Sequence, residues 1–108
     1  MKNNYEFVKF KSGFGVSIQA SSRNYCDPKN NHGPYTAVEL GFPTASEPLI
    51  MEYAEDRNNP TETVYGWVPA AVVTALVIKH GGVERGSMPD LDMSAEQSAI
   101  LADILSMV

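Results

Sequence analysis

Two polar segments of this chain combine a guanidinium group with side-chain amides, a combination that can bind phosphate oxygens and the edges of bases. Arg23, Asn24 and Tyr25 are consecutive in the first segment, and Arg57 and Asn58 lie in the second. A planar guanidinium binds phosphate through two parallel hydrogen bonds. The same residue types are also common in turns, where asparagine bonds to nearby backbone. We therefore expect either a ligand-binding surface that uses both segments or two ordinary capped loops.

Aromatic residues near these segments could complete a nucleotide site. Tyr65 and Trp67 are two positions apart in TVYGWV, so an extended strand would place both on one face. Together with Tyr25 and Tyr35 they offer flat surfaces for stacking a purine. The alternative is that they belong to the core, which is common for aromatic residues in a short chain. The exposure of Trp67, the only tryptophan, separates the two interpretations.

The sequence contains no signature of an enzyme. Cys26 is the only thiol and shares a loop with His32, and a thiol nucleophile needs such a base within hydrogen-bond reach. We expect instead a cysteine that packs beneath the loop. His32 and His80 are far apart in sequence, and no CxxC or HxxxH pair offers metal ligands. We expect no catalysis, metal or cofactor, and keep a small hydrolase that uses Cys26 or two carboxylates as an alternative.

The charge balance limits the partners. Thirteen acidic and eight basic residues give a net charge of −5, which argues against binding to duplex DNA. Two or three arginines can still serve a small phosphate ligand. No apolar run is long enough to cross a membrane, and the first residues, MKNNYEF, lack the apolar centre of a signal peptide. With a single cysteine, these features predict a cytoplasmic protein.

The elements that would position these residues follow from hydrophobic periodicity. Residues 16–42 contain two alternating segments, VSIQAS and TAVELGF, on either side of a Pro- and Asn-rich stretch, which predicts a hairpin with a long tip. Further strands are expected at residues 5–11, 49–54 and 63–68. Residues 70–80 predict a helix that follows Pro69 and ends at two glycines, with a sixth strand as the alternative.

A last helix is expected after Ser94, which with Gln97 resembles a capping box. Its apolar stripe consists of Ile100, Leu101, Ile104, Leu105 and Val108. Strands first and helices last predict one α+β domain over residues 1–108, with an antiparallel sheet of about five strands and two C-terminal helices packed on one of its faces. Edge strands and uncovered apolar surface in so short a chain predict a homo-oligomer, with contributions from Val72, Leu76 and the outer side of the last helix.

The segments SIQASSRNYC, GPYTAVELGFP and TVYGWVP look like those of small phage proteins, and the order of elements is similar to that of the Thoeris anti-defence family. Members of that family are sponges that hold cyclic ADP-ribose isomers made by TIR enzymes, and in some cases cyclic oligonucleotides, without cleaving them. The resemblance implies a phage protein that acts in the host cytoplasm and sequesters a cyclic nucleotide signal.

The sequence thus leaves two main hypotheses. The first is a non-catalytic protein that sequesters a cyclic nucleotide or cyclic ADP-ribose signal, with Arg23 and Arg57 on phosphate and Arg85 uninvolved. The second is a protein–protein inhibitor or adaptor whose acidic surface meets a basic partner.

Overall fold

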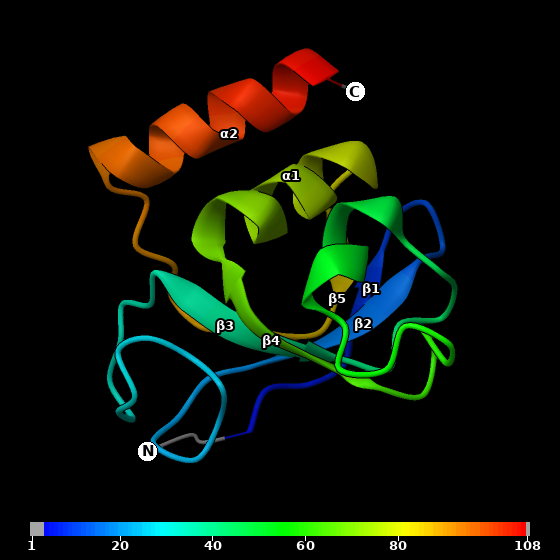
Figure 1. The fold of residues 1–108 in the computed structure, drawn as a ribbon, viewed down its shortest axis with the longest axis horizontal. Helices are drawn as coiled ribbons and strands as arrows, with labels where there is room; N and C mark the ends of the chain where they lie inside the picture. The colour runs from blue at the N-terminus through cyan, green and yellow to red at the C-terminus, as the bar shows by residue number, and fades with distance from the viewer. Residues whose placement is uncertain (1–3, 108) are drawn as a thin grey trace.

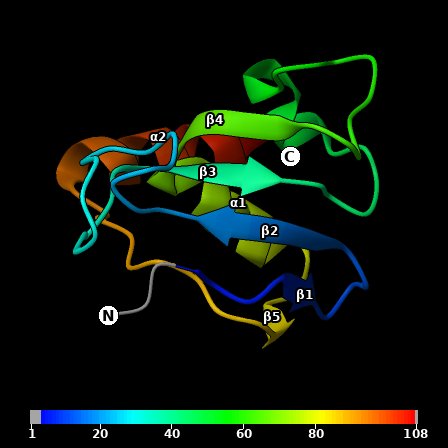
Figure 2. The same cartoon turned by 90° about the horizontal axis from the view of Figure 1, so that it is seen from below.

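Five antiparallel strands form one sheet in the order β4-β3-β2-β1-β5, as seen in Figure 2. The strands are β1 (Val8–Phe10), β2 (Gly15–Gln19), β3 (Ala37–Gly41), β4 (Val64–Pro69) and β5 (Val83–Arg85). This computed structural model describes residues 4–107. The α+β class predicted from the sequence is confirmed.

The predicted hairpin of residues 16–42 is present. β2 and β3 pair antiparallel with Ile18 opposite Leu40, and both side chains are fully buried. Alternation of buried and partly exposed residues along both strands explains why the pattern was readable from the sequence. Residues 20–36 form the long loop that joins them.

Two elements differ from the expectation. Residues 49–54 are not a strand, because Pro48–Tyr53 forms a 3₁₀ helix, η1, whose start is capped by the Glu47 side chain. Pro48 stands in the first turn, where a missing N–H costs nothing. The fifth strand is instead β5, which pairs with β1 and was expected to be a loop. Its three residues are all exposed, so no apolar pattern marks it.

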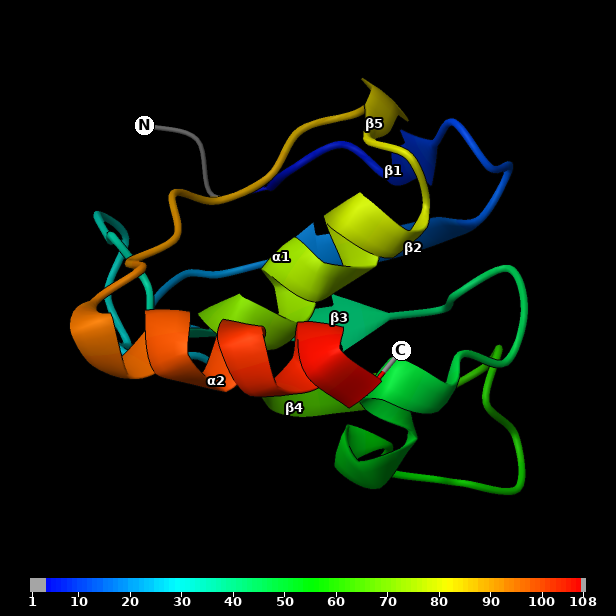
Figure 3. The same ribbon diagram turned by 90° about the horizontal axis from the view of Figure 1, so that it is seen from above.

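The helices form two further layers on one side of the sheet (Figure 1). α1 (Ala70–Lys79) packs on the sheet with six buried residues, as predicted, whereas α2 (Ala95–Met107) lies outside α1 and has no fully buried residue among those described (Figure 3). Half of the predicted capping box is present, because the Ser94 hydroxyl oxygen accepts a hydrogen bond of 3.4 Å from the Gln97 N–H, but the Gln97 side chain does not complete it. Its Oε1 accepts a hydrogen bond of 3.0 Å from the backbone N–H of Ala71, which joins the two helices.

Some residues assigned to an oligomer interface lie in the core instead. Val72 is 4% exposed and Leu76 is fully buried within the chain itself, so the expectation for these two side chains is wrong. On α2, Leu105 and Met107 are exposed, and Val108 lies outside the described residues. Within residues 4–107 no helix has the length and apolar character to cross a membrane.

Candidate functional site

Trp67 is placed by a β-bulge between β3 and β4. The register of the two strands shifts so that Gly66 and Trp67 together face Glu39. The extra residue reverses the alternation of side chains, which leaves Tyr65 fully buried and Trp67 54% exposed. The expectation that Tyr65 and Trp67 share one face is therefore wrong. Trp67 has a φ of 49°, a conformation that is costly for a bulky side chain.

The exposed indole stacks on Tyr25 from the long loop. The two ring centroids are 4.9 Å apart with 25° between the ring planes. The backbone carbonyl of Tyr25 accepts a hydrogen bond of 3.0 Å from the Trp67 N–H, and a Glu39 carboxylate oxygen accepts one of 3.0 Å from the Tyr25 N–H. The long loop is thus fastened to the edge strand β4 at the bulge.

These rings form one wall of a hollow of about 330 Å³, which we call the aromatic pocket. Its lining consists of Tyr25, Tyr53, Glu55, Gly66 and Trp67. Three aromatic rings and one exposed carboxylate therefore converge at the edge of the sheet. Lys29 already lies over the Tyr25 ring, with its Nζ 5.9 Å from the centroid. The pocket chemistry suits a cation, because aromatic faces and a carboxylate both attract positive charge.

A second hollow is polar and is lined in part by the residues that precede Tyr25 in the chain. It has a volume of about 490 Å³, and Arg23, Asn24 and Asn31 are among its lining residues. Arg23 is exposed, and its guanidinium has no ion pair or hydrogen bond with any residue that the structure describes. Asn24 is engaged, since its Oδ1 accepts a hydrogen bond of 2.6 Å from the Ser21 hydroxyl. Arg23 is the freer of the two to bind a ligand.

Arg57 and Asn58 line neither of these two hollows. Their loop precedes β4 and lies at the opposite end of β3 and β4 from the long loop of residues 20–36 in all three ribbon views (Figures 1–3). An Arg57 Nη donates to the Glu52 carbonyl at 3.3 Å. The Asn58 N–H and the Asn59 side chain both bind Asp56, and these hydrogen bonds, the one from Asn59 foremost, lower the pKa of its carboxyl. This loop has the hydrogen bonds of an ordinary turn.

The remaining candidates from the sequence are buried. Tyr35 and Tyr65 are almost completely covered, and their hydroxyls donate to the carbonyls of Asn30 (2.9 Å) and Pro60 (2.5 Å). They therefore offer no face to a ligand. Cys26 is 2% exposed beneath the loop, as expected, and burial raises the pKa of its thiol. His32 is exposed.

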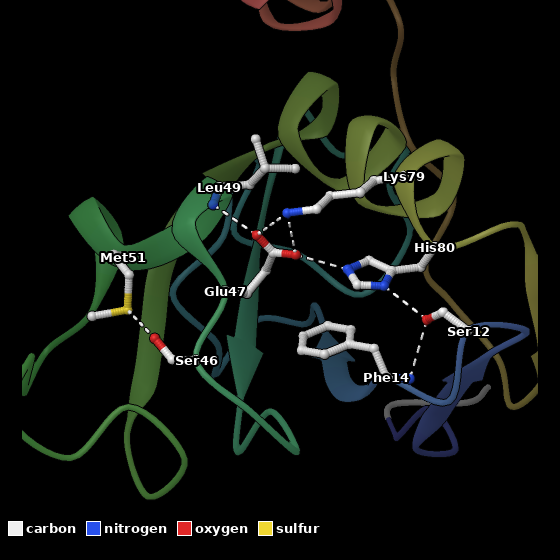
Figure 4. A network of polar contacts seen from close by, with 8 residues as sticks. All are labelled: Ser12, Phe14, Ser46, Glu47, Leu49, Met51, Lys79 and His80. Carbon is white, nitrogen blue, oxygen red and sulfur yellow. Dashed lines mark hydrogen bonds and ion pairs between the residues drawn. The ribbon is translucent and has the colours of Figure 1, made fainter. Parts of the chain in front are cut away.

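A cluster around Glu47 was not foreseen. This carboxylate is 2% exposed and lies between η1 and the end of α1 (Figure 4). It accepts hydrogen bonds from the Leu49 N–H at 2.9 Å and from Lys79 at 3.0 Å, and pairs with His80 at 2.7 Å. Burial alone would raise the pKa of Glu47, but these three partners together lower it. The sequence gives only a weak indication of this cluster. A glutamate precedes Pro48, and two basic residues, Lys79 and His80, stand at the end of the predicted helix.

The fold and the aromatic pocket together define a small α+β protein with an aromatic-lined pocket on an edge strand. Comparisons with protein-family models, curated proteins and solved structures found no match to the chain. Within residues 4–107 no group of three or more His, Cys, Asp or Glu side chains is arranged to hold a metal ion.

Proposed function

We propose that this chain is a binding protein that recognises a basic side chain of a protein partner in the aromatic pocket. The observation that carries the proposal is the lining, in which Tyr25, Tyr53 and Trp67 meet Glu55. A cation over an aromatic face gains about 0.5–2 kcal/mol, depending on its desolvation. A carboxylate beside the rings adds attraction and disfavours an anion at the same place.

The overall charge supports the same class of partner. A net charge of −5 raises the encounter rate with a basic surface, an effect that weakens as salt is added. Exposed tryptophan and tyrosine are frequent among the residues that dominate interface energies. Trp67 also occupies a backbone conformation that glycine would adopt at lower cost, and such strain is concentrated at functional positions.

The first experiment uses the emission of Trp67, the only tryptophan. Titration with tetra-arginine should change the emission in a saturable, salt-sensitive way, whereas tetra-glutamate should not. Glu55→Gln should weaken tetra-arginine binding, and Glu84→Gln, which removes an exposed carboxylate on β5, is the matched control. Unchanged emission with millimolar tetra-arginine, or equal binding by the Glu55 variant and the parent, would contradict the proposal.

Trp67→Gly separates binding from stability. Glycine relieves the positive φ but removes the ring. We expect the variant to melt close to the parent and to lose binding of tetra-arginine, measured by calorimetry because the fluorophore is gone. Phe42→Gly is a matched control, because Phe42 is also 54% exposed and has a φ of 51°, yet it does not line the aromatic pocket.

Sequestration of a cyclic nucleotide, as the resemblance to Thoeris anti-defence proteins implies, is the second candidate function. It is favoured by the Arg23 guanidinium, which has no partner among the described residues and lines a polar hollow together with Asn24, the residue before Tyr25. A base would stack on the aromatic pair while Arg23 binds phosphate. Arg57 belongs to another loop, where its guanidinium donates to the Glu52 carbonyl, so Arg23 is the cation on which this candidate rests.

Glu55→Gln should change the binding affinity in opposite directions for the two candidate ligands. Removing the Glu55 charge weakens the binding of a cation in the aromatic pocket but strengthens the binding of an anion there. A sponge should also gain melting temperature with a cyclic ADP-ribose isomer, release it unaltered after denaturation, and lose binding in Arg23→Ala but not in Arg85→Ala. No thermal shift with cyclic nucleotides, combined with tetra-arginine binding, would reject the sponge and leave the first proposal.

A further inference from the structure

A second polar cluster lies outside the aromatic pocket and joins three distant segments. Ser12 comes from the turn between β1 and β2, Glu47 caps η1, and His80 follows α1. Figure 4 shows the three side chains in line, with the imidazole between the hydroxyl and the carboxylate. We propose that Ser12 is a nucleophile activated by His80 and oriented through Glu47, and that this site transfers acyl groups from activated esters.

The hydrogen bonds fix the direction of proton transfer. The Ser12 Oγ is 2.8 Å from Nδ1 of His80, and a Glu47 oxygen is 2.7 Å from Nε2. An ionised carboxylate only accepts, so Nε2 carries the proton and Nδ1 is left as the base. The Phe14 N–H donates to the Ser12 oxygen at 3.2 Å, which leaves the hydroxyl hydrogen for Nδ1. This is the order of roles that an activated serine requires.

The imidazole is held on several sides. The Phe14 ring stacks on it with centroids 4.4 Å apart and 17° between planes, and Phe10 lies 5.7 Å away. The Ser12 N–H donates to the His80 carbonyl at 3.0 Å, which ties the turn to the end of the helix. The His80 side chain is 14% exposed and that of Glu47 only 3%. The base is therefore fixed and shielded from competing water, while Ser12 remains exposed.

The hydroxyl opens into a hollow of about 500 Å³ that Phe14, Pro48 and Lys79 also line. In this space the Ser12 oxygen would attack the carbonyl carbon of an ester as its proton passes to Nδ1. Collapse of the tetrahedral intermediate breaks the bond to the leaving alcohol, which takes that proton. Water then attacks the acyl carbon of the acylated serine and gives a proton to Nδ1. Collapse of this second intermediate breaks the bond to the Ser12 oxygen, which takes the proton back from Nδ1, and releases a carboxylic acid.

Lys79 shares the carboxylate that orients this base. Its ammonium contacts both oxygens of Glu47 at 3.0 Å, so part of the carboxylate's attraction for a protonated His80 is already offset. We therefore expect slow turnover, with general-base catalysis contributing about 10²–10⁴-fold. Lys79→Met removes the ammonium but keeps an apolar stem. It should raise the rate at which Ser12 reacts, because an unshared carboxylate better stabilises the imidazolium that forms as the hydroxyl proton is transferred.

The test is covalent labelling of the full chain with a fluorophosphonate. Attack by Ser12 forms an oxygen–phosphorus bond, expels fluoride and passes the hydroxyl proton to His80, so the product is a stable adduct visible by intact mass and peptide mapping. We expect the adduct on Ser12 and labelling at least about 100-fold slower in Ser12→Ala and His80→Gln. Ser46→Ala should react like the parent, because Ser46 lines the same hollow without touching His80.

Hydrolysis of p-nitrophenyl acetate keeps the test informative if His80→Gln does not fold. Ser12→Ala keeps the imidazole and its carboxylate partner but lacks the nucleophile, so it should lose the hydrolysis that the parent shows. Absence of a Ser12 adduct in the parent, or labelling or ester hydrolysis by Ser12→Ala at the parent rate, would each overturn the proposal.

Discussion

Replacement of Glu47 by glutamine should destabilise the fold strongly at neutral pH and much less in acid. Glutamine keeps an oxygen for the Leu49 N–H but removes the charge that binds Lys79 and His80. Hydrogen bonds to charged groups contribute about 1.5–3 kcal/mol each to the free energy of unfolding. The loss is reduced because the Lys79 side chain is 38% exposed, so water can solvate its ammonium in the variant. We expect a loss of about 2 kcal/mol at pH 7, equivalent to about 8–16 °C in melting temperature.

The pH dependence follows from the direction of the pKa shift. Burial raises the pKa of Glu47, but its three hydrogen-bond partners outweigh burial and lower it. A carboxyl group with a lowered pKa stabilises the fold above its ordinary pKa of about 4.3, and this contribution is lost as pH falls through the folded value. Urea denaturation at a series of pH values should therefore show parent and Glu47→Gln converging below about pH 4.

Glu84→Gln is the control for Glu47→Gln. Glu84 pairs with Lys9 at 3.8 Å and its side chain is 51% exposed, so its loss should cost less than about 1 kcal/mol. A Glu47→Gln variant that is as stable as Glu84→Gln at pH 7, or a difference from the parent that does not change with pH, would refute the reasoning about the buried carboxylate.

Four further predictions concern other parts of the chain. The Cys26 thiol, whose pKa burial raises, should react with a disulfide reagent far more slowly in the native than in the urea-unfolded protein. Tyr65→Phe should lose about 1 kcal/mol in urea denaturation, because the hydroxyl donates to the Pro60 carbonyl. Gly86→Ala should cost more than about 2 kcal/mol by the same measurement, since φ is 104° and a Cβ would lie 2.3 Å from the Phe7 carbonyl oxygen. Homo-oligomerisation stays a prediction, and light scattering that gives a mass of 11.8 kDa would contradict it.

Periodicity was sufficient for the elements that bury one face. The hairpin of β2 and β3 was predictable because buried and partly exposed residues alternate along both strands. Helix α1 was predictable from the proline before it and the two glycines after it. The prediction of a strand at residues 49–54 was wrong because the sequence LIMEYA suits a short strand or a helix. The helix is favoured by a side chain outside the segment, Glu47, which caps its start. Strand β5 was not predicted because its three residues are exposed and have no apolar pattern.

The candidate site was predictable only in part, for a similar reason. Tyr25 and Trp67, both candidates from the sequence, line the same pocket. A bulge cannot be read from alternation, so Tyr65 was wrongly placed beside Trp67. Tyr53 and Glu55 come from a segment whose structure was misjudged. Long-range pairs of polar residues leave no local pattern in one sequence, which is why the cluster around Glu47 was missed.

The short helix η1 links the two sites that we propose. Glu47 fixes its first residue to the end of α1, and Tyr53, its last residue, lines the aromatic pocket. At about 2 Å per residue, six residues of 3₁₀ helix separate the sites by about 12 Å. A substitution at Glu47 can therefore reach the pocket through the position of Tyr53. Ser12→Ala removes the nucleophile but leaves the cap on η1 intact, so it is the variant that tests catalysis without disturbing recognition.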